Sequence, residues 1–110
     1  MQVVFESRDT EAHDMRDVAE SRLRFALRRL AWLVPRATLR LTDINGPRGG
    51  VDKRCQVELK TPDGELVVTS IARDWRDALD TALARAARAL SRSHQRRHAL
   101  RRQPGALPAA

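Results

Sequence analysis

Two histidines, His94 and His98, are the side chains in this sequence best spaced to share a metal ion. A spacing of four residues places both imidazoles on one face of a helix. Zinc sites need three or four ligands, and no carboxylate or thiol lies nearby in the sequence. We therefore expect two solvated histidines near a helix end, with no metal and no cofactor.

Cys55 is the single cysteine, so it forms no internal disulfide and no multi-cysteine metal site. It lies in an alternating apolar and polar segment without an obvious acid–base partner, so we expect a core residue rather than a nucleophile. The glycine-rich stretch 45–50 lacks the Gly-Lys-Ser/Thr of a phosphate-binding loop. Arg48, Lys53 and Arg54 fit a secondary phosphate contact and a solvated loop equally well. The sequence thus predicts no enzyme and no small-molecule substrate.

Arginine is the residue type whose placement indicates a binding function. The chain carries 21 Lys and Arg against 14 Asp and Glu, but residues 84–103 hold seven arginines and no acid. Basic and acidic residues balance over the rest of the chain. A genome that favours arginine explains the excess of arginine over lysine, but it does not explain the missing acids. A local basic surplus is typical of proteins that bind a polyanion, most often a nucleic acid, and a merely solvated face is the alternative.

These arginines recur at helical spacing. At about 100° per residue, four of them form one row beside an apolar stripe, with Asp77 and Asp80 on the opposite flank. The row consists of Arg85, Arg88, Arg92 and Arg96. In the preceding helical segment, Arg22 and Arg29 share one line and Arg28 lies beside it. If the two helices pack side by side, we expect both rows to border the groove between them, where a phosphate backbone would neutralise them.

Hydrophobic periodicity predicts the elements that position these arginines. The predicted strands cover residues 2–6, 37–44, 52–60 and 65–72, and the predicted helices cover residues 11–32 and 75–98. Pro35 ends the first helix, and short links join the last three strands into an antiparallel meander. The order β-α-β-β-β-α predicts an α+β two-layer sandwich, in which two long helices cover one face of a four-stranded sheet and the other face is solvated.

Chain length and composition indicate one domain over residues 1–100, followed by a disordered tail over residues 101–110. No apolar run reaches the roughly 18 residues of a membrane span, and the first residues lack the features of a secretory signal. We therefore expect a cytoplasmic protein with no membrane partner.

The few aromatic residues bear on the mode of binding. Phe5 and Trp75 fit core positions, whereas Phe25 and Trp32 lie off the apolar stripe and are expected to be partly exposed. The strands lack the aromatic-rich signature of an RNA-recognition motif. We therefore expect contacts with the backbone and shape of structured RNA rather than readout of bases.

Four stretches of the sequence form a set of recognisable motifs: residues 16–23, the basic turn Arg28-Arg29-Leu30, residues 62–68 (PDGELVV) and residues 74–80 (DWRDALD). The last of these is followed by Arg85, Arg88, Leu90 and Arg92. The set resembles the short ribosome hibernation-promoting factors, a family also called ribosomal subunit interface proteins or ribosome-associated inhibitors. Residues 16–23 and the basic turn resemble the first helix of the family, residues 62–68 resemble its hairpin, and residues 74–80 resemble the start of its second helix. The four residues that follow match the basic centre of that helix. The similarity covers about residues 2–98.

The resemblance implies a bacterial protein that binds ribosomal RNA of the small subunit in the channel for messenger and transfer RNA. Family members there block translation and promote ribosome hibernation under stress or in stationary phase. The RNA-binding role carries over to Arg22, Arg28, Arg85, Arg88 and Arg92, and helical geometry adds Arg29 and Arg96.

The chain departs from the family at a longer 45–50 loop and at Phe25, where the family often has lysine. It ends without the dimer-forming domain of longer members, so we do not expect it to dimerise on its own. Two alternatives remain open. A free-standing double-stranded-RNA-binding module would bind an isolated duplex but not small subunits, and an adaptor for an acidic protein would keep its partner under nuclease.

Overall fold

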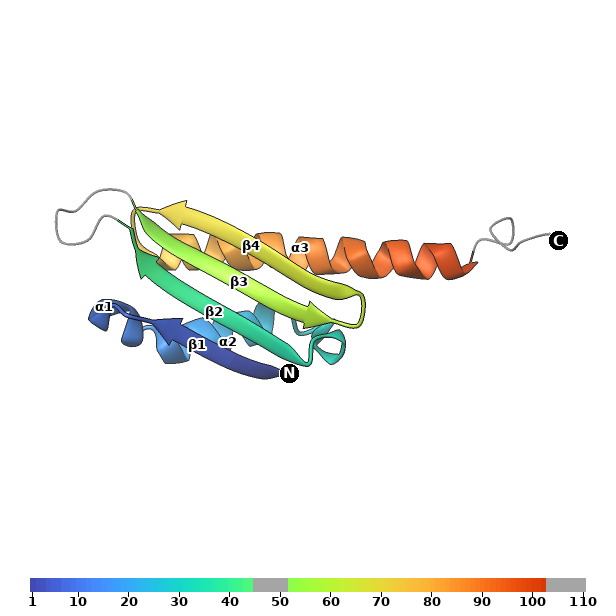
Figure 1. Ribbon diagram of the computed structural model, residues 1–110, viewed down its shortest axis with the longest axis horizontal. Helices are drawn as coiled ribbons and strands as arrows, with labels where there is room; N and C mark the ends of the chain where they lie inside the picture. The colour runs from blue at the N-terminus through green and yellow to red at the C-terminus, as the bar shows by residue number, and fades with distance from the viewer. Residues whose placement is uncertain (45–51, 103–110) are drawn as a thin grey trace.

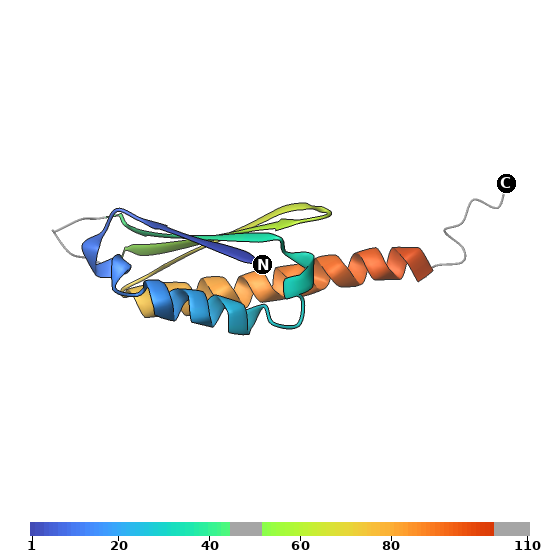
Figure 2. The ribbon, with the colours of Figure 1, turned by 90° about the horizontal axis from the view of Figure 1, so that it is seen from below.

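A computed structural model describes residues 1–44 and 52–102, with side chains up to residue 99. The predicted α+β sandwich is confirmed: a four-stranded sheet forms one layer, and the helices cover one of its faces (Figure 1; Figure 2). The 45–50 loop and residues 103–110 of the predicted tail lie outside the described residues.

The sheet contains β1 (Gln2–Ser7), β2 (Arg36–Asp43), β3 (Lys53–Thr61) and β4 (Gly64–Ala72), in that spatial order. Each strand begins and ends within one residue of its predicted bounds. The last three strands form the expected antiparallel meander. β1 pairs with β2 in parallel, and a parallel pair requires a crossover connection, which the segment containing α2 supplies.

The first predicted helix is wrong in its extent. Instead of one helix over residues 11–32, the chain forms α1 (Thr10–His13), α2 (Arg16–Ala26) and a 3-10 helix, η1 (Ala31–Leu33). A helix of 22 residues would extend about 33 Å, whereas the eight residues of β2 span only about 26 Å. The chain therefore leaves the helix early, so that it can return to the sheet at Arg36.

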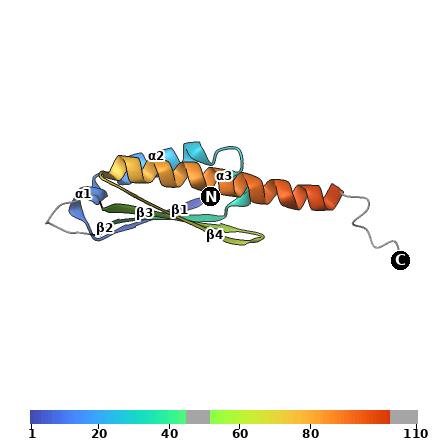
Figure 3. The same cartoon turned by 90° about the horizontal axis from the view of Figure 1, so that it is seen from above.

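The second long helix, α3 (Trp75–Arg102), is longer than predicted and includes the first two residues of the expected tail. Its first turn is capped by Asp74, whose Oδ1 accepts a hydrogen bond of 2.8 Å from the backbone N–H of Asp77. α3 crosses the sheet on the side of β3 and β4, and its C-terminal part continues beyond the β3–β4 turn (Figure 1; Figure 3).

The core fills the space between the two layers. Leu39 of β2 and Val57 of β3 are completely buried there, together with Leu23 of α2 and Leu79 of α3. Val18 of α2 fits the helical spacing of apolar residues in the sequence, but it is 40% exposed. The two layers are thus held together by aliphatic side chains that alternate along the strands and recur along the helices.

The opposite face of the sheet is mostly polar, as predicted, although Val67 and Ile71 of β4 are exposed on it. Arg40 lies at its centre and donates one hydrogen bond of 2.7 Å from Nε to Oε2 of Glu6 and another from Nη1 to Glu58. The hydrogen bonds to Glu6 and Glu58 raise the pKa of Arg40. Arg40 is therefore neutralised by neighbouring carboxylates.

Gly64, in the β3–β4 turn, has a φ of 124°, and an added Cβ would meet no atom within 4 Å. Gly64→Ala is therefore expected to lower the free energy of unfolding through backbone conformation alone, by about 1–3 kcal/mol. Urea unfolding monitored by circular dichroism measures the change. Glu65→Ala, at the neighbouring exposed position, is the matched control, and an equal loss of stability in both variants would contradict the interpretation.

Candidate nucleic-acid interface

The arginine row predicted on α3 is present. Arg85, Arg88, Arg92 and Arg96 are all exposed along this helix. The same helix buries Ala82, Ala86 and Leu90 against the sheet. Within residues 1–44 and 52–99, no carboxylate forms an ion pair with any of the four guanidinium groups. α3 therefore presents a line of positive charge that the described part of the protein does not neutralise.

The expected position of this row relative to α2 is wrong. Arg85 donates a hydrogen bond of 3.1 Å from Nη1 to the backbone carbonyl of Thr69 on β4. The flank of α3 that meets the end of α2 instead carries Ala87 and Ser91. Spacing along a helix fixes which side chains share a flank, but only the packing of α3 on β3 and β4 decides which neighbour that flank faces. The row therefore lies on the side away from α2.

Arg85 differs from the other members of the row, because its guanidinium is held against β4 by the contact with Thr69. Arg88, Arg92 and Arg96 have no such contact among the described residues. We therefore assign these three as the members of the row best able to reorient toward a bound polyanion.

Arg22 is matched by a carboxylate. Its Nη1 lies 2.6 Å from Oδ1 of Asp80, and this ion pair joins α2 to α3. Both side chains are partly exposed, so the pair contributes about 0.2–1 kcal/mol to stability. Asp80 neutralises Arg22 locally, which gives Arg22 a structural contact and weakens the expectation that it binds phosphate.

Arg28 and Arg29 lie in the turn that follows α2 rather than on the helix, and both are exposed. Arg28 Nη1 donates a hydrogen bond of 2.8 Å to the carbonyl of Phe25, and its guanidinium carbon lies 4.1 Å from the centre of the Phe25 ring. The cation–π contact and the hydrogen bond hold this positive charge in place at the surface. A second basic region therefore exists, across α3 from the arginine row.

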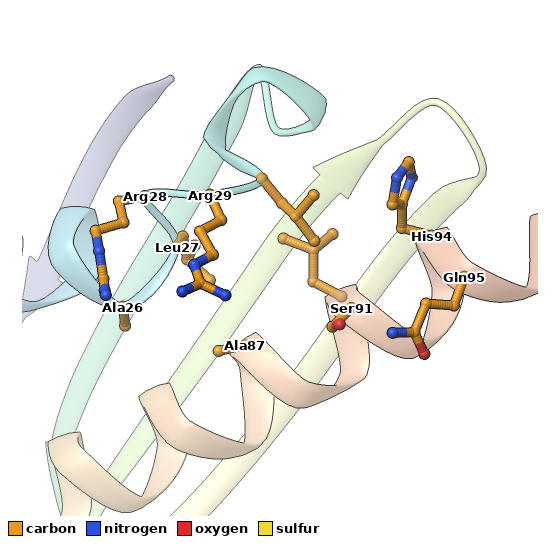
Figure 4. Close-up of a pocket in the computed structure, with 10 residues that line it drawn as sticks. Ala26, Leu27, Arg28, Arg29, Ala87, Ser91, His94 and Gln95 are labelled. Atoms are coloured by element: carbon orange, nitrogen blue, oxygen red, sulfur yellow. The ribbon is translucent and has the colours of Figure 1, made fainter. Parts of the chain in front are cut away.

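A pocket of about 270 Å³ separates this turn from α3 (Figure 4). Leu27, Leu30 and Leu90 supply apolar lining, and Ser91 and Gln95 contribute polar groups. The sequence does not predict this pocket, because residues from two elements make it and the sequence does not reveal how those elements are placed relative to each other.

One aromatic side chain, His94, lines the pocket, and Trp32 contacts it from outside the lining. Phe25 is 67% exposed and Trp32 is 71% exposed, as expected for both from the sequence. The ring of His94, which lines the pocket, meets the Trp32 ring edge-on with 5.7 Å between centroids, and it stacks on His98 at 6.0 Å. The two histidines thus form part of an aromatic cluster. In the described part of the chain, no group of three or more His, Cys, Asp or Glu side chains is arranged to hold a metal ion.

Lys53 is also engaged within the protein. Its Nζ donates a hydrogen bond of 2.5 Å to Oδ2 of Asp43 and lies 5.0 Å from the centre of the Trp75 ring. The hydrogen bond to Asp43 raises the pKa of Lys53. Lys53 is not a solvated loop residue, because it lies in β3. Its hydrogen bond to Asp43 also leaves it poorly placed for a phosphate contact.

Cys55 is fully buried in the core, as expected, and burial raises the pKa of its thiol to about 12. In the unfolded chain the thiol ionises near pH 8.5. Above that pH the unfolded state therefore binds fewer protons than the folded state, and stability falls as the pH rises. Between pH 8 and pH 10 we expect Cys55 to lower the free energy of unfolding by about 2 kcal/mol. Urea unfolding of the wild type and Cys55→Ala at both pH values measures this, and an identical pH dependence in the two would contradict it.

Over the described residues, none of the helices has the length and apolar character needed to cross a membrane.

Comparison with known proteins bears on the fold. A ribosomal subunit interface protein from Coxiella burnetii superposes with a TM-score of 0.71 at 12% sequence identity, over 86% of this chain and 99% of the other. The N-terminal domain of Protein Y from Thermus thermophilus superposes with a TM-score of 0.63 at 21% identity, over 84% of this chain and 98% of the other. No protein-family model and no curated protein sequence matches the chain. The resemblance indicated by the sequence is thus confirmed for the fold.

Proposed function

We propose that this chain is a ribosome-associated protein of the hibernation-promoting type, which binds ribosomal RNA of the small subunit in the channel for messenger and transfer RNA. Its fold is that of a ribosomal subunit interface protein and of the Protein Y N-terminal domain. It acts without an enzymatic step, in the bacterial cytoplasm, by occupying the channel under stress or in stationary phase and so inhibiting translation.

The observation that carries this proposal is the exposed arginine row of α3, which no described carboxylate neutralises. Guanidinium groups held in line repel one another. Phosphate groups remove this repulsion and release the counterions condensed on the RNA, so that binding weakens as salt rises. The rigid helix fixes the spacing of the row. A folded RNA with phosphates along one ridge is therefore a better partner than a flexible polyanion.

Arg28 and Arg29 extend the basic surface to the other side of α3. RNA that lies over the helical layer would meet the row on one side and this turn on the other. Arg40, on the opposite face of the sheet, is less suited to binding RNA, since Glu6 and Glu58 neutralise it.

Sedimentation of the purified chain with isolated small ribosomal subunits in sucrose gradients tests the proposal. We expect the chain to move with the subunit at low salt, to dissociate as salt rises, and to inhibit translation in a cell-free system. A chain that stays at the top of the gradient with subunits, yet binds an isolated RNA duplex, would be a double-stranded-RNA-binding module instead. A complex that survives complete digestion of the RNA would indicate an acidic protein partner.

A further inference from the structure

The pocket between the turn after α2 and helix α3 has the size of a site for a single ring system. Its volume of about 270 Å³ is just below the roughly 300–1,000 Å³ of pockets that enclose whole drug-sized ligands. Ala26, Leu30 and Ala87, which are partly exposed, form an apolar lining on which a flat ring can lie. The pocket is therefore suited to one planar, partly apolar group.

Polar groups lie on both sides of this lining. Ser91 and Gln95 lie along α3, and a hydroxyl with a carboxamide supplies both donors and acceptors. On the opposite side, Arg29 directs its guanidinium into the space between the turn and α3 (Figure 4). An apolar floor, a mixed donor and acceptor edge and a cation match the ring, the polar edge and the phosphate of one nucleotide.

Trp32 adds a surface for stacking beside the pocket. Its indole is 71% exposed, and its edge-on contact with His94 links it to the pocket lining. Exposed aromatic rings next to basic side chains are the usual platform for unpaired bases, because every base has a face that can stack.

We propose that this pocket binds one unpaired base of a single-stranded RNA segment, with Arg28 and Arg29 on its phosphates and Trp32 stacked on the next base. The inference rests on the proposed function and makes it more specific. The arginine row of α3 would bind the RNA backbone. The opposite flank of the same helix would select RNA that has an unpaired base. Base contacts would then accompany the backbone recognition expected from the sequence.

Fluorescence anisotropy with two labelled hexanucleotides tests the pocket directly. One is single-stranded oligoadenylate, and the other is an abasic RNA with the same phosphates but no bases. We expect the full chain to bind the adenylate at least about tenfold more tightly than the abasic strand, since stacking on aromatic side chains stabilises the binding of each base. Equal binding of the two strands by the wild-type chain would overturn the proposal without recourse to any variant.

Two variants test whether the preference for the strand with bases depends on the pocket. Ser91→Leu fills the pocket without changing charge. We expect this variant to bind both strands with the affinity that the wild type has for the abasic strand. Ala84→Leu adds a similar side chain at an exposed position of the same helix, and we expect it to keep the wild-type preference. A preference that survives in Ser91→Leu would overturn the pocket assignment.

Gradients with small subunits, run on the same proteins, separate this proposal from the proposed function. Binding to the subunit without a preference for bases would overturn the assignment of the pocket as a base-binding site and would still support the ribosomal role. A preference for bases that Ser91→Leu abolishes, without any subunit binding, would support the pocket and overturn the ribosomal role.

Discussion

Exchanging Arg88 and Arg92 for glutamate is expected to abolish co-sedimentation of the chain with small ribosomal subunits. Both side chains are exposed on α3, and no described carboxylate pairs with either. A hydrogen bond to a charged group contributes about 1.5–3 kcal/mol, so the loss of two corresponds to at least about a hundredfold in affinity. Repulsion between the new carboxylates and phosphate adds to this. The slope of log K against log salt should fall by up to about two units, a figure taken from duplex DNA.

The matched control reverses the same number of charges on the opposite face of the molecule. Arg36 and Lys60 are both exposed and lie opposite each other on β2 and β3. Arg36→Glu with Lys60→Glu should therefore leave subunit binding within a few-fold of the wild type. If this control loses binding as completely as the α3 variant, net charge rather than the arginine row drives the association, and the proposed interface is wrong.

Leu79→Ala is expected to cause the largest loss of stability. Leu79 is completely buried between α3 and the sheet, and removing its side chain from a packed core costs about 2–5 kcal/mol through lost burial and the remaining cavity. Domains of this size have only about 5–15 kcal/mol of stability in total. Urea unfolding followed by circular dichroism measures the loss.

Val67→Ala is the corresponding control, because Val67 is 53% exposed on β4. A surface substitution of this kind changes stability by about 0.5 kcal/mol or less. Leu79→Ala should also keep the wild-type dependence of subunit binding on salt wherever it remains folded, since it removes no charge. A stable Leu79→Ala protein with an altered salt dependence would mean that α3 is not held by the core described above.

The sequence predicted the strands well because alternation has a period of two, which Leu39, Leu41, Cys55 and Val57 follow without interruption. The first helix was predicted less well. Its apolar spacing continues through residue 32, but the distance back to the sheet ends α2 at Ala26. Helical periodicity therefore identified the element, and the three-dimensional path of the chain set its length.

The same distinction holds for the candidate site: positions along one helix could be predicted from the sequence, but contacts between elements could not. Arg85, Arg88, Arg92 and Arg96 form the exposed row that the spacing predicted, because positions along one helix are fixed by helix geometry. The ion pair of Arg22 with Asp80 could not be predicted, since it depends on the packing of two helices. The same holds for the pocket between α2 and α3, which requires residues from both.

The hydrogen bond from Arg85 to the carbonyl of Thr69 has a consequence for how molecules of this protein meet one another. β4 is the last strand of the sheet, and a terminal strand is a template onto which a strand from another molecule adds, leading to aggregation. An incoming strand would first have to displace the Arg85 guanidinium from the acceptor it needs. Occupation of this carbonyl by the Arg85 guanidinium is thus expected to hinder edge-to-edge association through β4, independently of any role in binding RNA.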